Sequence, residues 1–171
     1  MNKIQIEIEE WQKLIGRAII ASGEIELVTY KCLTFLPTEN IFEVVADLPF
    51  SKRIDLICRL IEDKPLSKEL RDNFLKLLNE GKEMAVTRNL IAHNPMQISV
   101  FENEITGDMR AMPEIVARRK NKKLIRIKDM RKFTSEVERV SLGIHALLGQ
   151  VISACNGTTI KSEKDYSDTE K

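Results

Sequence analysis

The sequence predicts a mainly α-helical protein: an up-and-down helical bundle with a small antiparallel β insertion before the last helix. Only 7 glycines and 5% aromatic residues stand beside 31% charged residues, a composition that favours helices over a sandwich or barrel. Long segments repeat apolar residues every three or four positions, as amphipathic helices do. One segment, about residues 97–128, alternates with a period of two instead, which is typical of strands.

Four helices are expected before the β insertion, each with apolar residues gathered on one face. They span Ile8–Leu36, Ile41–Leu48, Ser51–Asp63 and Ser67–His93. Ser51 and Ser67 are the expected N-caps of the third and fourth helices, because a serine hydroxyl accepts a hydrogen bond from the first free amides. The fourth helix is expected to stop near His93, because Pro95 disfavours helical conformation at the residue before it.

Three short strands are expected in the insertion, over residues 97–101, 114–118 and 124–128. The last helix is expected over Asp129–Ala154, where apolar residues recur without interruption. Residues 1–155 would then form one helical domain. Residues 156–171 are polar and charged, so a disordered tail is expected there.

Several classes of protein are excluded or disfavoured. No stretch approaches the roughly 20 apolar residues of a membrane span. The first residues lack the basic-then-apolar order of a signal peptide, so a cytoplasmic protein is expected. Cys32, Cys58 and Cys155 have no metal-ligand spacing and are expected to be buried, reduced thiols. No metal or other cofactor is predicted.

Three polar residues close the fourth expected helix: Arg88, Asn89 and His93. Arg88 interrupts an otherwise apolar seam, where a cation is costly unless it is paired or hydrated. Asn89 and His93 are four apart and share a face, whereas Arg88 lies about 140° from His93 around the helix. A purely structural reading is open for each: Arg88 could pair with a buried Glu, and His93 could interact with the helix dipole.

Taken together, the three side chains suit a phosphate. Arginine binds phosphate oxygens through two parallel hydrogen bonds. Histidine, with an ordinary pKa of about 6.5, takes or gives a proton near neutrality. An asparagine orients either group. This set is sufficient for metal-free attack of a ribose 2′-hydroxyl on the neighbouring phosphodiester.

The stretch Arg88–His93, RNLIAH, resembles the R-N-x-x-x-H motif of HEPN domains (higher eukaryotes and prokaryotes nucleotide-binding). Ser22–Leu33 and Phe50–Asp63 are similar to the first helices of small bacterial members, and the resemblance covers about residues 5–155. The β insertion departs from the simplest helical members, but it does not interrupt the motif.

The resemblance implies a metal-independent endoribonuclease that leaves a 2′,3′-cyclic phosphate, in a toxin–antitoxin or antiviral defence setting. It implies a homodimer in which two motifs face one cleft, and an antitoxin as a further partner. His93 would transfer the proton, Arg88 would hold the phosphate and Asn89 would position them. Glu24 or Glu26 would either add a polar contact or be surface charge. The alternative is a non-catalytic HEPN-like dimer that binds RNA, a nucleotide or a partner protein.

A basic stretch supports RNA as a partner. Nine basic residues between positions 118 and 132 face one acid, Asp129, although the whole chain has a net charge of only +1. The expected RNA-binding residues are Arg118, Arg119, Lys120, Lys122, Lys123 and Arg126. The competing reading is a solvated hairpin whose lysines protect a strand edge. His145 on the last helix is expected to be a boundary residue, and Trp11 and Tyr30 to be packing residues or interface anchors.

Overall fold

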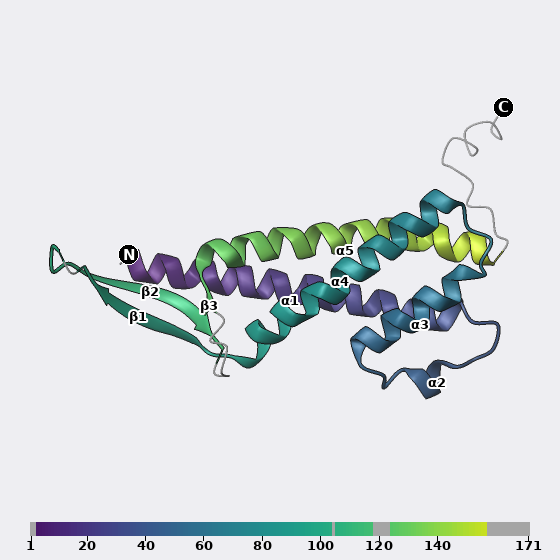
Figure 1. Cartoon of the computed structure of the whole chain (residues 1–171), viewed down its shortest axis with the longest axis horizontal. Helices are drawn as coiled ribbons and strands as arrows, with labels where there is room; N and C mark the ends of the chain where they lie inside the picture. The colour runs from purple at the N-terminus through teal and green to yellow at the C-terminus, as the bar shows by residue number, and fades with distance from the viewer. Residues whose placement is uncertain (1–2, 104, 118–123, 157–171) are drawn as a thin grey trace, which may run out of the picture. The chain divides into compact units, whose positions relative to one another are not determined.

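The computed structural model describes residues 3–103, 105–117 and 124–156 of the chain. The described part is mainly helical, with a three-stranded antiparallel sheet before the last helix (Figure 1), as predicted. Its elements are α1 (Lys3–Phe35), α2 (Phe42–Val45), α3 (Phe50–Glu62), α4 (Lys68–His93), β1 (Met96–Glu102), β2 (Met109–Val116), β3 (Leu124–Ile125) and α5 (Ile127–Cys155). None of these helices is long and apolar enough to cross a membrane. The expected disordered tail lies almost wholly outside the described residues.

The chain divides into two compact units. The first comprises Met1–Glu24 and Glu83–Ser141, and the second comprises Ile25–Lys82 and Leu142–Lys171. The first unit therefore contains the sheet and the end of α4. The second contains α2 and α3.

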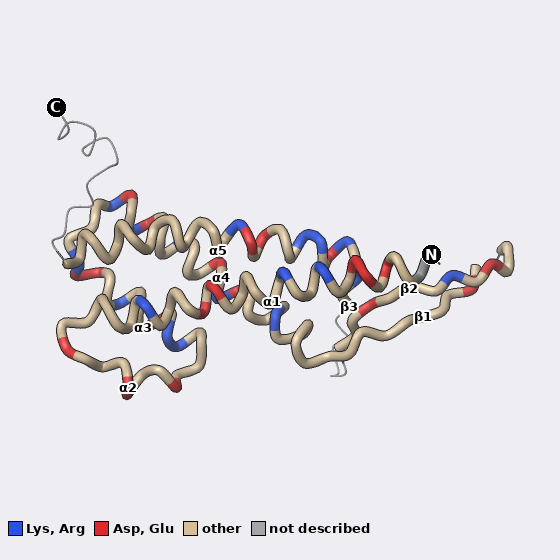
Figure 2. The backbone as a smooth tube through the Cα atoms, turned by 180° about the vertical axis from the view of Figure 1, so that it is seen from behind, with Lys and Arg blue, Asp and Glu red and all other residues tan. Residues whose placement is uncertain are grey.

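In the first unit, two ion pairs join the early turns of α1 to those of α5. Arg17 donates to both carboxylate oxygens of Glu138 at 2.7 and 2.6 Å, and Arg131 binds Glu10 in the same two-pronged way at 2.6 and 2.8 Å. Acidic and basic residues accordingly lie along both helices (Figure 2). The buried side chains of these segments include Trp11, Leu14, Ala18, Met130, Phe133 and Val137. Fork-shaped pairs of this kind orient the helices, and the apolar burial supplies most of the stability.

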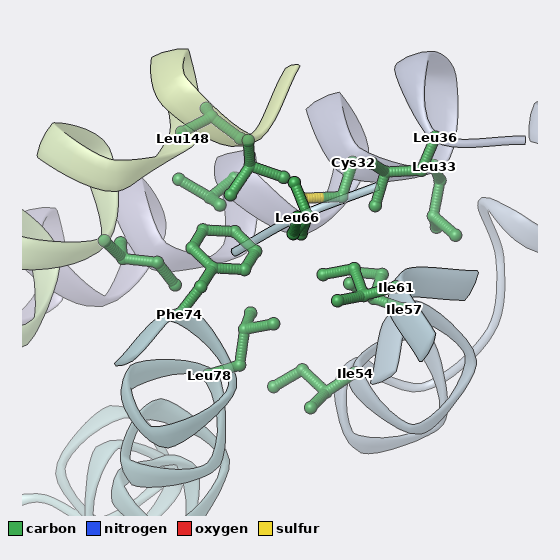
Figure 3. Packing of buried hydrophobic residues seen from close by; sticks show 13 residues of the cluster. Cys32, Leu33, Leu36, Ile54, Ile57, Ile61, Leu66, Phe74, Leu78 and Leu148 are labelled. Atoms are coloured by element: carbon green, nitrogen blue, oxygen red, sulfur yellow. The ribbon is translucent and has the colours of Figure 1, made fainter. Parts of the chain in front are cut away.

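In the second unit, a continuous apolar cluster lies between the later turns of α1, helix α3, the first half of α4 and the end of α5 (Figure 3). Its fully buried members include Cys32, Leu33, Ile54, Ile57, Ile61, Phe74, Leu78 and Ile144. The glycine at position 143 allows close packing here, because a Cβ on it would stand 3.1 Å from Cδ1 of Leu77. Burying each large side chain contributes roughly 1.5–3 kcal/mol.

The sheet has the order β1–β2–β3, and both pairings are antiparallel. The first strand matches the prediction within one residue at each end. The second begins at Met109, five residues before the expected start, because Pro113 is accommodated inside it. Pro113 pairs with Ile98, at a position whose missing N–H faces away from β1, so the proline removes no hydrogen bond from that ladder.

Three helix starts differ from prediction. Helix α1 begins at Lys3, five residues before the expected Ile8. Helix α3 begins at Phe50 with Pro49 as its N-cap and no side-chain cap, so the prediction of Ser51 as the cap was wrong. The third strand is only two residues long, because α5 begins at Ile127. The Asp129 carboxylate accepts a hydrogen bond from the Arg126 amide at 3.1 Å, the reach-back contact that stabilises a helix start. The cap at Ser67 is confirmed, since its hydroxyl accepts from the Leu70 amide at 3.3 Å.

Candidate functional site

The motif residues lie at the C-terminal end of α4, as the sequence predicts. His93 is the last residue of the helix, and Pro95 follows in an exposed link to β1. The Asn94 side chain donates to the carbonyl of Leu90 at 2.8 Å. That bond satisfies one of the last carbonyls of the helix, which otherwise lack an intrahelical partner. The Asn94 side chain therefore caps this end of α4.

The structure brings two of the three motif side chains into direct contact. Nη1 of Arg88 donates to Oδ1 of Asn89 at 2.9 Å. Arg88 is half-buried, between the half-buried Met84 and the buried Ile91 on the seam of α4. The guanidinium therefore keeps access to water, which lowers the cost of placing a cation on this seam.

His93 is exposed and lies one helical turn beyond Asn89 on the same face. Within the described part of the chain, no hydrogen bond joins His93 to Arg88 or Asn89. The imidazole is accessible. It lies about 140° around the helix axis from Arg88, because the two residues are five positions apart. One copy of the motif thus presents a held guanidinium and a separate imidazole.

Sequence reasoning missed a third residue on the face of Asn89 and His93. Val86 is 62% exposed. It stands three residues before Asn89 and seven before His93, so all three share one side of α4. The spacing of Val86 from Asn89 and His93 along the sequence could have identified it. The exposed valine adds apolar area to a face that otherwise presents two exposed polar residues.

The structure describes only the second part of the basic stretch, from residue 124 onward. Arg118, Arg119, Lys120, Lys122 and Lys123 lie outside the described residues. Arg126 is exposed, and so is Lys128. Arg131 is paired with Glu10, and Lys132 lies 3.8 Å from a Glu136 oxygen. Acidic partners therefore neutralise part of the positive charge at the described end of the stretch. The order of residues within the stretch did not indicate this.

A second arginine in the chain is more deeply buried than Arg88. The Arg53 side chain is 4% exposed and forms an ion pair with Glu26, whose side chain is 29% exposed. Its Nη1 donates to the Tyr30 hydroxyl at 2.6 Å and to the Ala46 carbonyl at 3.1 Å. The guanidinium also stacks 4.2 Å above the Tyr30 ring. Glu26 is thus a partner of Arg53, and Tyr30 is a packing residue, one of the two roles expected.

The signal for this arginine was also present in the sequence. Arg53 stands four and eight residues before Ile57 and Ile61, so it continues the apolar seam of α3, as Arg88 continues that of α4. Nearly inaccessible to solvent and joined to several groups, Arg53 is suited to holding α1 against the start of α3. We assign it a structural role.

The cysteines and the remaining histidine form no visible site. All three cysteines are free, and only Cys32 is fully buried, whereas Cys58 and Cys155 are half-buried. Burial raises the pKa of the Cys32 thiol to about 12. His145 is half-buried on α5. Among the described residues, no cluster of His, Cys, Asp or Glu is arranged to hold a metal ion.

Comparison with known protein families, curated proteins and solved structures finds no significant match for this chain.

Proposed function

We propose that this chain is a metal-independent endoribonuclease of the HEPN type that cleaves RNA by attack of a 2′-hydroxyl and leaves a 2′,3′-cyclic phosphate. The observation that carries the proposal is the end of α4. There Asn89 holds the Arg88 guanidinium, and the imidazole of His93 is exposed one turn further on. The biological setting in the proposal, a toxin–antitoxin or antiviral defence system, comes from the sequence resemblance.

The proposed chemistry assigns each group one task. His93 removes the proton from the 2′-hydroxyl or gives one to the departing 5′-oxygen. Arg88 binds the phosphate oxygens and stabilises the negative charge that develops on them. Asn89 accepts the hydrogen bond that fixes the guanidinium. The P–O bond to the 2′-oxygen forms, the bond to the 5′-oxygen breaks, and no external reactant is required.

The proposal includes a homodimer, because one α4 presents Arg88 and His93 about 140° apart. Two helix ends facing each other would surround one phosphate with a guanidinium from one copy and an imidazole from the other. The exposed Val86 supports an interface on this face, since it adds apolar area beside the polar pair. Exposed Arg126 and Lys128 would contribute phosphate contacts along the RNA.

Cleavage of single-stranded RNA in the presence of a chelator tests the proposal. His93→Ala should lower the rate about 10²–10⁴-fold, the usual contribution of a general acid or base. Arg88→Ala should lower it about 10²–10³-fold. Arg88→Lys should recover only part of the loss, because an ammonium lacks the planar fork. His145→Ala is the matched control, since it removes the chain's other histidine, and it should cleave at the parent rate.

The alternative is a non-catalytic dimer of the same kind that binds RNA, a nucleotide or a partner protein. The bond between Arg88 and Asn89 also fits this reading, because it satisfies polar groups at an interface without any substrate. RNA that binds but is never cut, over a broad panel of sequences, would favour the alternative. Cutting that persists unchanged in both His93→Ala and Arg88→Ala would rule out the proposed site.

A further inference from the structure

Strand β1 is an outer strand of the sheet, and it exposes apolar side chains on both faces, most of them on one. In the order β1–β2–β3, one side of β1 faces no strand among the described residues. Ile98 is 49% exposed and Val100 is 62% exposed on one face, and Phe101 is 43% exposed on the other. The described part of the chain leaves this edge open.

The backbone of β1 points alternately toward β2 and toward the open edge, and the turn between the strands fixes the phase. The amide of Asn103 donates to the carbonyl of Asp108 at 2.9 Å, so the backbone groups of residue 103 point toward the β2 side. Because neighbouring residues alternate, those of Ile98, Val100 and Glu102 point away. Pro113 agrees with this phase, since it pairs with Ile98 and needs no N–H there.

This edge has little of the usual protection against pairing, since its one charged residue, Glu102, is the last of the strand. Natural edge strands are kept short, carry a lysine or proline, or contain a bulge that twists them away. Strand β1 runs for seven residues without a proline or a basic residue. Its register with β2 advances one residue at a time from Met96 to Glu102, so it contains no bulge. A strand with this edge is a template for another strand.

We propose that β1 pairs antiparallel with β1 of a second copy of this chain, about a two-fold axis at Ser99. In this register Ile98 pairs with Val100 of the partner subunit, and Met96 pairs with Glu102 of the partner subunit. Both pairs use the backbone groups that point to the open edge, so each exchanges two hydrogen bonds. Each pair occurs twice because of the axis.

The sequence of the strand fits a second copy in this register. An axis at Ser99 overlaps the whole of Met96–Glu102, whereas an axis at Ile98 or Val100 leaves one end unpaired. It also places apolar Ile98 against the partner's Val100, a β-branched pair of the kind that stabilises sheets by roughly 0.2–1 kcal/mol. On that face the pair continues into Ala111 and Pro113 of β2. The small Ser99 lies at the closest approach.

This pairing is an interface beyond the proposed function and does not rest on it. With the axis at Ser99, the two Met96 Cα atoms stand six residues apart along the paired strands, or roughly 20 Å. His93 precedes Met96 by three residues. The two motifs therefore do not meet across the β1 edge, and the shared cleft of the ribonuclease proposal requires a different face. The two interfaces can succeed or fail independently.

A pair of cysteines tests the register directly. Gln97 and the partner's Phe101 would be opposite each other at a non-hydrogen-bonded position, with Cα atoms about 4.5 Å apart, which suits a disulfide. The double variant Gln97→Cys/Phe101→Cys should form a covalent dimer on mild oxidation. Each single variant should cross-link no more than the parent, because the two copies of position 97, or of position 101, would be roughly 14 Å apart. The native cysteines are present in all four proteins.

Equal cross-linking of the single and double variants, or none in a folded double variant, would overturn the proposal. Amide hydrogen exchange of the unmodified chain gives a second measurement. The amides of Ile98 and Val100 should become protected as protein concentration rises, whereas those of Ser99 and Phe101 should be protected throughout. Ile98 and Val100 amides that exchange freely at every concentration would exclude the pairing. Neither readout depends on RNA cleavage.

Discussion

The buried ion pair of the second unit makes a quantitative prediction: removing its carboxylate should destabilise the fold more than removing its cation. Arg53 is nearly inaccessible, whereas Glu26 retains contact with solvent. In Arg53→Met, an apolar chain of similar length replaces the guanidinium over the Tyr30 ring, and the remaining carboxylate can be hydrated. In Glu26→Gln, the guanidinium stays buried and loses its counter-charge.

The expected magnitudes follow from this asymmetry. Removing one partner of a fully buried pair costs about 3–5 kcal/mol, and the exposure of Glu26 together with the bonds from Arg53 to Tyr30 and Ala46 should reduce this to about 2 kcal/mol for Glu26→Gln. Arg53→Met leaves no buried charge without a partner, because the Glu26 carboxylate that remains is partly exposed to water, so this variant should lose about 1 kcal/mol, less than Glu26→Gln. In a chain of this length, about 2 kcal/mol corresponds to a fall in Tm of roughly 4–8 °C.

Urea unfolding followed by far-ultraviolet circular dichroism measures both variants and the double variant. The double variant should lose less stability than the sum of the two single losses, because Arg53 and Glu26 interact directly. A larger loss in Arg53→Met than in Glu26→Gln would refute the reasoning. Strictly additive losses in the double variant would do so as well.

Three further predictions concern the thiol, the surface pairs and the motif face. The pKa of Cys32 is raised to about 12, so unfolding releases a proton at alkaline pH. The free energy of unfolding should therefore fall by about 1.4 kcal/mol per pH unit above pH 9. Urea titrations at alkaline pH should show a smaller fall for Cys32→Ala. The hydrogen bond from Arg17 lowers the pKa of Glu138. The ionised Glu138 therefore stabilises the fold at neutral pH, and this stabilisation should be lost only as the pH falls below the ordinary carboxylate range. Glu138→Gln should remove that part of the acid transition in pH-dependent melting. Val86→Glu should weaken self-association and RNA cleavage together, measured by sedimentation and by rate, whereas Leu142→Glu, at another exposed apolar position, should change neither.

Local signals made the motif end of α4 predictable. Pro95 sets where the helix stops, and Asn94 lies where a polar side chain can cap it, so the placement of His93 followed from neighbours in sequence. The period of two in Gln97–Phe101 likewise predicted β1. These features depend on residues only a few positions apart, so they can be predicted without knowing the rest of the fold.

Other features depend on residues far apart in sequence or on conflicting local signals. The pairing of Arg131 with Glu10 joins residues 121 positions apart, so the basic stretch looked more open than it is. Strand β2 extends past Pro113 because the proline falls at a position that needs no donor, and that depends on the register. The place of Arg53 on the apolar seam of α3 follows from its spacing to Ile57, but its partners on α1 are apparent only in the folded chain.

The most direct test of the central claim is the chemical identity of the RNA ends that the purified chain makes when divalent metals are chelated. Mass spectrometry of the 5′ fragment should find a terminal 2′,3′-cyclic phosphate, and this product should disappear with His93→Ala while persisting with His145→Ala. A 3′-hydroxyl end, or a strict need for added metal, would contradict a metal-free site at the end of α4.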